Sequence, residues 1–441
     1  MDSVNRSKYR FSIILGAVVL LCLLYYNAVG EPASQLSTRT VEGLQSLGKQ
    51  YTVWKPFIPT PRKNHEWYKS QCFLGAFSED IESFVLVELP TWSSSDIPEC
   101  KELYNRFSIL YNIKHRPIDD IENISHGKQN NSVIHVSSPL TFEHAVYNVE
   151  ATRTPKVIDS DIFKWVDKVS NETAKNCDFC SVNTQTAIDE FGRSENSSSA
   201  RLSNTFKLEK WHTIVVTRTH HPTNISKDAF IRLLESTLPW IRMVAAKDPD
   251  YIFPNMIWDT LHHAGASQMH PHIQIMVSPD HYYGFAEQLR SAAQSYHNHV
   301  DENYFNDVLE THEALGLVTH YHDAVAISII TGKTDLEVLL LSYTPGEALY
   351  KLLYYTITTL HQNFYEPCHS VGMAWPPVVG GQRAAQARIP AIIRVAARGD
   401  CDSTVSDFTA RELYQIVLRK YSPWEIAHSI RNTITKEEKG S

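Results

Sequence analysis

One ten-residue segment constrains the fold and the chemistry of this chain more than any other. Residues 265–274 read Gly-Ala-Ser-Gln-Met-His-Pro-His-Ile-Gln, and the end of the segment opens an apolar run typical of a buried strand. Side chains two positions apart share one face of a strand, so His270, His272 and Gln274 lie on the same side. The segment therefore predicts a strand whose start presents two imidazoles and an amide to one site.

The residues in front of the two histidines favour an anion-binding loop. Gly265, Ala266 and Ser267 have small side chains, so their backbone N–H groups can approach a phosphate closely, and the Ser267 hydroxyl adds a donor. A His-x-His pair taken alone is more often part of a surface or a core than of a site. The small residues before it and Gln274 after it favour a phosphate-binding site here.

The chain alternates apolar strands with amphipathic helices from about residue 145 onward. In its first part, apolar spacing predicts strands at 211–217, 251–258 and 273–277 and helices at 227–246 and 281–316. In its second part, it predicts strands at 324–330, 337–341 and 389–395 and helices at 345–362 and from about 410 onward. A unit of strands and helices thus occurs twice. We expect an α+β fold of two similar fused halves, 145–318 and 319–441, each an antiparallel sheet with helices.

Composition and charge indicate which kinds of molecule the chain can bind. The chain has 441 residues, of which 43% are hydrophobic and 20% charged, an ordinary globular composition with length for two or three domains. It carries 41 Lys and Arg against 49 Asp and Glu, a formal net charge of −8. This balance lacks the basic surface that a phosphate backbone requires, so we expect no nucleic-acid partner.

The first thirty residues are typical of a membrane-targeting segment. A basic stretch at 1–10 precedes an apolar run at 11–29, close to the roughly 20 residues with which a helix crosses a bilayer. The positive flank predicts a cytoplasmic tail at 1–10 and a single-pass type II membrane protein whose body lies in the lumen of the Golgi or the endoplasmic reticulum. Ala28-Val-Gly30 also fits a signal-peptide cleavage site, and a cleaved chain would be secreted.

The segments that follow fit the secretory pathway. Residues 30–64 are rich in Ser, Thr, Pro and Gly and predict a stalk, and 65–144 form an N-terminal extension to which we assign no chemistry. Five N-glycosylation sequons lie beyond the apolar run, at Asn123, Asn130, Asn171, Asn196 and Asn224. The simplest disulfide pairs are Cys72 with Cys100 and Cys368 with Cys401.

The pattern Gly-x-Ser-x-x-His-Pro-His-x-Gln resembles the active-site motif of the galactose-1-phosphate uridylyltransferases, a family of the histidine-triad (HIT) superfamily. The hydrolases of that superfamily usually carry a third histidine where this chain has Gln274, and glutamine marks the nucleotidyl-transferring branch. The resemblance implies that His272 is the nucleophile that forms a covalent nucleotidyl-histidine. It also implies that Gln274 binds the phosphoryl oxygens, and that Gly265, Ala266 and Ser267 form the phosphate loop.

Many members of this family hold a structural zinc ion. The resemblance implies that Cys177, Cys180, His221 and His270 are its ligands here, with His220 a neighbour of the third ligand. Such a Cys₂His₂ set is closed and therefore structural, and it would hold His270 and the strand that follows in place. Taken without the resemblance, the Cys-x-x-Cys pair also fits a disulfide or a redox pair.

The resemblance, which spans about residues 145–420, implies a two-step transfer. His272 attacks the α-phosphorus of a nucleotide sugar and releases a sugar 1-phosphate, and a second sugar 1-phosphate then attacks the nucleotidyl-histidine. The implied enzyme is a nucleotidyltransferase that resembles UDP-glucose:hexose-1-phosphate uridylyltransferase. It needs no cofactor beyond the structural zinc ion, and members of the family commonly form homodimers.

Two features depart from the family pattern. Asp259 lies where the family usually has an asparagine, so a negative charge occupies a position expected to contact the nucleotide. The strand at 389–395 has no histidine, so we expect the second half to be a degenerate structural copy without a metal ion. Two alternatives follow: a phosphorylase or hydrolase of nucleotide sugars with the same intermediate, or a non-catalytic zinc-binding membrane glycoprotein that keeps the fold.

Overall fold

The computed structural model describes residues 55–72, 96–123, 127–148, 161–381, 384–385, 389–404 and 409–439. The predicted cytoplasmic tail and membrane segment lie outside these residues, as does most of the predicted stalk. Among the helices in the described part, none has both the length and the apolar character that crossing a bilayer requires. The predicted membrane segment and the predicted domain boundaries stay predictions.

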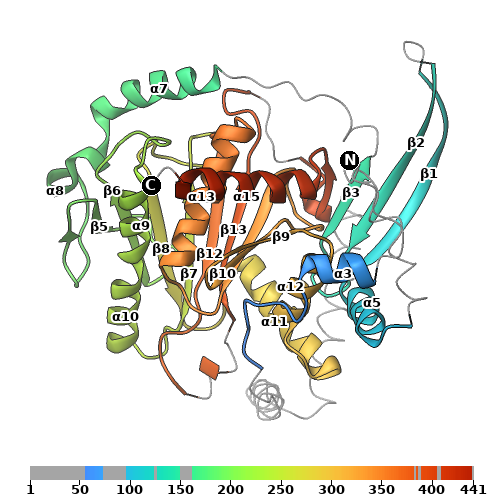
Figure 1. The fold of residues 1–441 in the computed structure, drawn as a ribbon. Coiled ribbons are helices and arrows are strands. Elements are labelled where there is room, and N and C mark those ends of the chain that lie inside the picture. Colours follow the sequence, from blue (N-terminus) through green and yellow to red (C-terminus); the bar gives the residue numbers. More distant parts are fainter. Residues whose placement is uncertain are drawn as a thin grey trace, which may run out of the picture. The chain divides into compact units, whose positions relative to one another are not determined.

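The described residues form helices and strands in alternation (Figure 1). The α-helices are α3 (His65–Gln71), α5 (Pro98–Leu110), α7 (Ile162–Thr173), α8 (Val182–Gln185), α9 (Lys227–Glu235), α10 (Thr237–Lys247), α11 (Gly284–Val300), α12 (Tyr304–Ala314), α13 (Glu347–Asn363) and α15 (Pro423–Lys439). Short 3₁₀ turns occur at η2 (Ala174–Asn176), η3 (Asp178–Ser181) and η4 (Glu412–Tyr414). The strands are β1 (Asn112–Asn123), β2 (Gly127–Ser137), β3 (His144–Asn148), β4 (Ser194–Glu195), β5 (Ser199–Ser203), β6 (Trp211–Thr217), β7 (Phe253–Asp259), β8 (His272–Ser278), β9 (Val318–Tyr321), β10 (Ala324–Ile327), β11 (Glu337–Ser342), β12 (His369–Ala374), β13 (Ala391–Ala397) and β14 (Ile416–Arg419).

The larger sheet repeats one arrangement of strands twice. Its order within the described residues is β4-β5-β6-β8-β7-β12-β13-β11-β10-β9, and neighbouring strands are antiparallel. In the first half, β5 pairs with β6, helices α9 and α10 follow, and β8 then inserts between β6 and β7. In the second half, β10, β11, α13, β12 and β13 repeat this path. The predicted α+β fold is confirmed, and its strand order shows the expected duplication.

The two halves join by direct strand pairing. Strands β7 and β12 are antiparallel neighbours, with Met256 opposite Met373 and Trp258 opposite Val371. The backbone hydrogen bonds therefore continue from one half into the other without an unpaired edge between them. This pairing fixes the position of the first half against the second.

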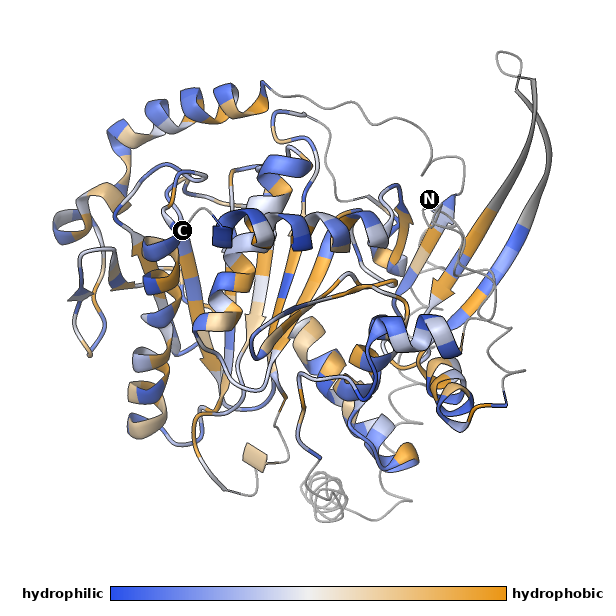
Figure 2. Cartoon of the chain, viewed as in Figure 1, coloured by the Kyte–Doolittle hydropathy of each residue, from blue (hydrophilic) through white to orange (hydrophobic). Residues whose placement is uncertain are grey.

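One face of the large sheet is packed against α9, α10, α13 and α15. Its strands supply alternate apolar side chains to this core, among them Val215, Ile273 and Ile275 in the first half and Leu340 and Ile393 in the second. Figure 2 shows the resulting apolar colour of the central strands. Burial of these side chains is the main contribution that holds the helices on this face.

The opposite face of the large sheet is covered by helices in the second half and only partly covered in the first half. In the second half, α11 and α12 pack on it against Val325, Ile327 and Leu339. In the first half, a small apolar cluster around Ile214 and Val216 covers only part of the face. The polar side chains of β8 that alternate with Ile273 and Ile275 are therefore free to line a cavity there.

A smaller sheet and an N-terminal segment complete the described fold. Strands β1, β2 and β3 are antiparallel, and β14 adds to β3 in parallel. The predicted disulfide Cys72–Cys100 is confirmed and ties the end of α3 to α5. The second predicted disulfide is wrong in this structure, because Cys368 and Cys401 are both free thiols, although they share one small buried cluster.

Several predicted elements differ from the structure at their ends. The helix expected over 227–246 is interrupted at Ser236, and the one expected over 281–316 is interrupted by Asp301, which takes a left-handed conformation with φ of 55°. The final helix begins at Pro423 rather than near 410, and the residues in between include β14. Proline at the start of a helix is favourable because its missing N–H would have no partner there.

Two of the histidines that the fold buries, His312 and His369, each donate a hydrogen bond from one ring nitrogen and accept one at the other. This arrangement requires the neutral ring. His312 Nδ1 donates to the Val308 carbonyl, and its Nε2 accepts from the Ile330 N–H. His369 Nδ1 donates to the Pro367 carbonyl, and its Nε2 accepts from the Thr260 hydroxyl. Burial lowers the pKa of both imidazoles to about 4. Both are therefore neutral in the folded protein at pH 7.

We predict that stability falls as the pH is lowered below about 6.5, where these histidines take up protons in the unfolded chain but not in the folded one. Each such group contributes a slope of up to about 1.4 kcal/mol per pH unit between about pH 6.5 and its folded pKa of about 4. Urea unfolding between pH 8 and 5 measures this slope. The variant His312→Gln should be less stable at pH 7 and show a smaller slope, whereas His299→Gln on an exposed position of α11 should not. An unchanged slope in His312→Gln would contradict the prediction.

Candidate active site and metal centre

The connection from β7 to β8 is a tight loop held by its own backbone. Gly265 has φ of 106°, a conformation open to glycine and unfavourable for other residues. The Gly265 N–H donates to the His262 carbonyl, and the Ala266 N–H donates to the Leu261 carbonyl. Both amides are thus used inside the loop in this structure, and the predicted contact of Gly265 and Ala266 with a phosphate stays a prediction.

His272 is the first residue of β8 and presents one free nitrogen. Its Nδ1 lies 2.8 Å from the His270 carbonyl oxygen, which can only accept, so Nδ1 carries the proton. Nε2 then has a free lone pair and no hydrogen-bond partner among the described residues. Burial lowers the pKa of His272, an effect opposed by its bond to His270 and by the Asp259 carboxylate. The imidazole is therefore neutral at pH 7, the form that a nucleophile requires.

A cavity of about 370 Å³ opens in front of His272. Of the predicted site residues, Ser267, His272 and Gln274 line it together. Gly265, Ala266 and Asp259 are not among its lining residues. Asp259, at the end of β7, lies beside Gly265 and acts on His272 through its charge.

The cavity is also lined by residues that the sequence analysis did not predict. Phe179, inside the Cys-x-x-Cys segment, meets His272 edge to face with ring centroids 5.1 Å apart and His270 at 6.0 Å. Asn204 also lines the cavity and contacts Gln274. Neither residue belongs to the motif, so the motif alone could not have identified them.

The second half presents no imidazole at the corresponding strand. On β13, the face opposite the helix-packed core carries Ile392, Arg394 and Ala396. These side chains line a separate cavity of about 230 Å³. The expectation that the second half is a degenerate copy without a metal ion stays a prediction.

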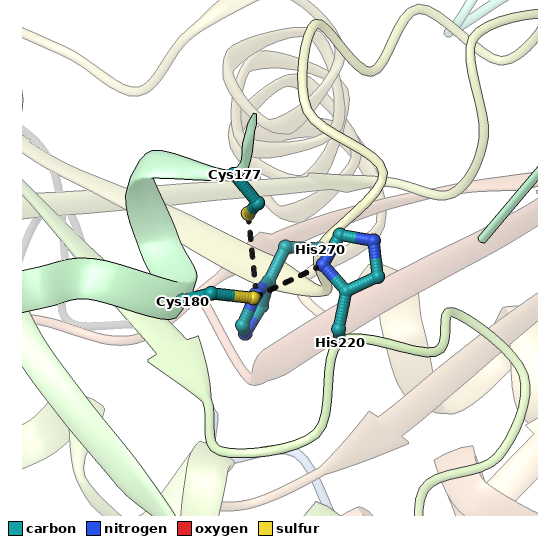
Figure 3. Close-up of side chains that lie close together, drawn as sticks. All are labelled: Cys177, Cys180, His220 and His270. Atoms are coloured by element: carbon teal, nitrogen blue, oxygen red, sulfur yellow. Dashed lines mark hydrogen bonds between the residues drawn. The ribbon is translucent and has the colours of Figure 1, made fainter. Parts of the chain in front are cut away.

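Two cysteines and two histidines form a cluster that could hold a metal ion (Figure 3). One ligand atom from each of Cys177, Cys180, His220 and His270 lies within 4.8 Å of all the others. The Cys177 and Cys180 sulfurs are each 3.5 Å from His270 Nδ1, and Cys180 Sγ is 3.4 Å from His220 Nδ1. Both cysteines are free, so the alternative of a disulfide between them is not realised in this structure.

The outer nitrogens of both histidines are held by protein groups. His270 Nε2 donates to the Thr217 carbonyl over 2.8 Å, and His220 Nε2 lies 3.1 Å from the Thr173 hydroxyl oxygen. A proton on each Nε2 leaves Nδ1 of the same ring as the ligand atom. Residues of β6, α7 and the loop before β8 therefore orient the cluster.

The third predicted ligand, His221, does not join the cluster, and His220 takes its place. His221 Nδ1 accepts from the Thr223 N–H over 3.3 Å, and its Nε2 contacts Asp167 Oδ1 at 2.8 Å. Both ring nitrogens are thus already used. The prediction chose the wrong member of two adjacent histidines because β6 ends at Thr217, and alternation no longer fixes which side chain turns inward.

Comparison with solved structures places the fold. No protein-family model and no curated protein matches the sequence. The structure is similar to ADP-glucose phosphorylase from Arabidopsis thaliana with bound ADP-glucose, at a TM-score of 0.51 and 12% identity over 68% of this chain and 98% of that one. It is also similar to a GalT-like protein from Arabidopsis thaliana, at a TM-score of 0.51 and 13% identity over 67% of this chain and 98% of that one.

These similarities define the fold of the chain as the one that this GalT-like protein and this ADP-glucose phosphorylase share. The resemblance seen in the sequence motif is thus confirmed at the level of the fold. The motif contains His272 and Gln274 of the cavity and His270 of the cluster. The resemblance implied Cys177 and Cys180 as further ligands, and the structure adds His220, Phe179 and Asn204.

We predict that His220→Ala removes most of the bound metal, whereas His221→Ala keeps it, because only His220 offers a ligand nitrogen to the cluster. The measurement is metal per chain by elemental analysis after dialysis against a weak chelator, with Cys177→Ser as a second loss-of-ligand variant. Equal metal content in the two histidine variants, or loss only in His221→Ala, would refute the assignment.

Proposed function

We propose that the chain is a nucleotidyltransferase that acts on a nucleotide sugar through a covalent nucleotidyl-histidine at His272. The observation that carries the proposal is the state of this side chain. Its Nδ1–H is donated to the His270 carbonyl, and its neutral Nε2 belongs to a residue that lines a cavity large enough for a nucleotide's phosphates and base.

The proposed chemistry has two balanced steps. His272 Nε2 forms a bond to the α-phosphorus of the nucleotide sugar, and the bond from that phosphorus to the bridging oxygen breaks, releasing sugar 1-phosphate. An acceptor oxygen then forms a bond to the same phosphorus, the bond from phosphorus to His272 Nε2 breaks, and neutral His272 is regenerated. Gln274 and Ser267, which line the cavity, supply donors for the charge on the non-bridging oxygens.

Two acceptors are consistent with this intermediate. A hexose 1-phosphate would make the enzyme similar to UDP-glucose:hexose-1-phosphate uridylyltransferase, the activity that the motif implies. Inorganic phosphate would make it a phosphorylase, and the similarity of the fold to ADP-glucose phosphorylase favours this second candidate. One experiment, described below, tests both which base the nucleotide donor carries and which acceptor releases the nucleotidyl group.

The metal proposed for the cluster is a structural zinc ion. In a tetrahedral zinc site, with Zn–S and Zn–N bonds of about 2.3 and 2.1 Å, sulfur and nitrogen ligands lie about 3.6 Å apart. The sulfur-to-nitrogen distances of 3.4 and 3.5 Å fit this geometry. With four protein ligands the ion would have no open position, and its contribution would be to hold Phe179 and His270 against His272.

We also propose that the enzyme works on the lumenal side of the secretory pathway, carried by the apolar segment at 11–29. The sequons at Asn171, Asn196 and Asn224 support this location, because all three lie at exposed positions. A nucleotide sugar in that compartment would be the donor, and a dimer is the proposed assembly.

We predict that wild-type protein incubated with its nucleotide-sugar donor gains the mass of one nucleotidyl group, whereas His272→Ala gains none. Intact mass spectrometry after brief incubation with UDP- and ADP-sugars measures the adduct, which acid should remove because it is a phosphoramidate. Release by hexose 1-phosphate identifies a transferase, and release by phosphate identifies a phosphorylase. Absence of an adduct with every donor, in folded metal-loaded protein, would reject the proposal and favour the non-catalytic alternative.

A further inference from the structure

We propose that His212 and Asn204 are positioning residues for Gln274, which turn its side-chain NH₂ group into the cavity as a donor to the phosphoryl oxygens. The inference rests on the proposed function, since it adds two residues to the same site. Both lie outside the Gly-x-Ser-x-x-His-Pro-His-x-Gln motif. His212 belongs to β6, the strand that pairs directly with β8.

The tautomer of His212 follows from its backbone partner. The Leu208 N–H lies 3.0 Å from His212 Nδ1, and a backbone N–H can only donate, so Nδ1 is the acceptor. Nε2 therefore carries the proton, and its acceptor is Gln274 Oε1, 3.2 Å away. Asn204 Nδ2 lies 3.0 Å from the same Nε2, and because both nitrogens are donors, they share Oε1 as their acceptor. His212 is buried, with 1% of its surface exposed, so water does not compete for these bonds.

The orientation of Asn204 is fixed in the same way. Its Oδ1 accepts from the Phe206 N–H over 2.8 Å, which identifies the oxygen end of the amide. The other end is then the NH₂ group, which lies 3.0 Å from Gln274 Oε1. Asn204 therefore presents a second donor to the same oxygen.

These two donors decide which way the Gln274 amide faces. An amide oxygen has two lone pairs, and here His212 Nε2–H and the Asn204 NH₂ group each approach Oε1. Turning the amide around would place its NH₂ group against two N–H donors and leave all of them unpaired. The NH₂ group of Gln274 is therefore the end that can donate to a ligand in the cavity that Gln274 lines.

The charges around His212 keep this arrangement at neutral pH. Burial lowers its pKa, the bond to Gln274 opposes that shift, Lys207 lowers the pKa further, and Glu209 raises it. The ring is therefore neutral, with one donor and one acceptor nitrogen, and both are occupied. A charged imidazolium would instead turn an N–H toward the Leu208 N–H.

The kinetic test separates positioning from binding. In His212→Leu the NH₂ group of Gln274 loses its fixed direction, and we expect kcat to fall about tenfold or more while KM for the nucleotide sugar changes less than about threefold. His212→Gln places an amide N–H near the former Nε2 and should restore kcat to within about threefold of wild type. The matched control is His299→Leu, on an exposed position of α11, which should leave both constants unchanged.

A double-mutant cycle identifies Gln274 as the group through which these residues act. In a Gln274→Ala background, His212→Leu and Asn204→Asp should have little further effect on kcat, since there is no amide left to position. In the wild-type background, Asn204→Asp should lower kcat, because a carboxylate in place of the NH₂ group draws the Gln274 NH₂ away from the cavity. Losses that simply multiply in the double variants would overturn the proposal.

A spectroscopic test does not depend on turnover. Long-range ¹H–¹⁵N spectra of protein labelled with ¹⁵N-histidine report the tautomer of His212, whose signals are assigned by their loss in His212→Leu. We expect a neutral ring with the proton on Nε2. An Nδ1–H ring or an imidazolium at pH 7 would overturn the positioning role, even in an active enzyme. The Nε2–H ring in a protein that forms no adduct would support the positioning role and reject the proposed function.

Discussion

The antiparallel pairing of β6 with β8 is the constraint on which the rest of the site depends. It sets Val216 opposite His272 and Ile214 opposite Gln274, and it brings the Thr217 carbonyl to His270 Nε2. A shift of this pairing by one residue would turn His272 and Gln274 into the helix-packed core and Ile273 into the cavity. One register thus sets the Cys₂His₂ cluster, the proposed nucleophile His272 and the amide of Gln274 that we propose binds the phosphoryl group. The core beneath β8 and the cluster at its start both stabilise that register.

The two halves share one strand arrangement but use the same face of the sheet differently. In the first half, the open face of the sheet keeps polar side chains and a cavity of about 370 Å³. In the second half, the same face is largely buried under α11 and α12, and β13 carries Ile392 and Arg394 there. The second half therefore acts as a rigid support that continues the sheet through β12. A site on strands braced in this way can hold its side chains more closely than a site on loops.

The sequence was sufficient for the parts of the fold that follow a simple period. Strands such as β6 and β8 and the shared face of His272 and Gln274 follow from alternation, and the motif led to the fold. The expectation that His270 joins the same site is wrong, because His270 precedes β8 and turns to the Cys₂His₂ cluster. The sequence was not sufficient where the chain leaves regular structure. After β6 ends, no period distinguishes His220 from His221, and backbone bonds inside the loop occupy the Gly265 and Ala266 amides. The role of His212 depends on the register between two strands, which a single sequence does not contain.

The His270 carbonyl, just before β8, fixes the proton of His272 on Nδ1, and we propose that Nε2 is the reactive nitrogen. The most direct test is the identity of the nitrogen that carries the nucleotidyl group. Protein labelled with ¹⁵N-histidine is trapped with its donor, and ³¹P–¹⁵N coupling with the ring ¹⁵N shifts shows which nitrogen is bonded to phosphorus. We predict a bond at Nε2 of His272 with Nδ1 still protonated. A bond at Nδ1, or at any residue other than His272, would contradict it.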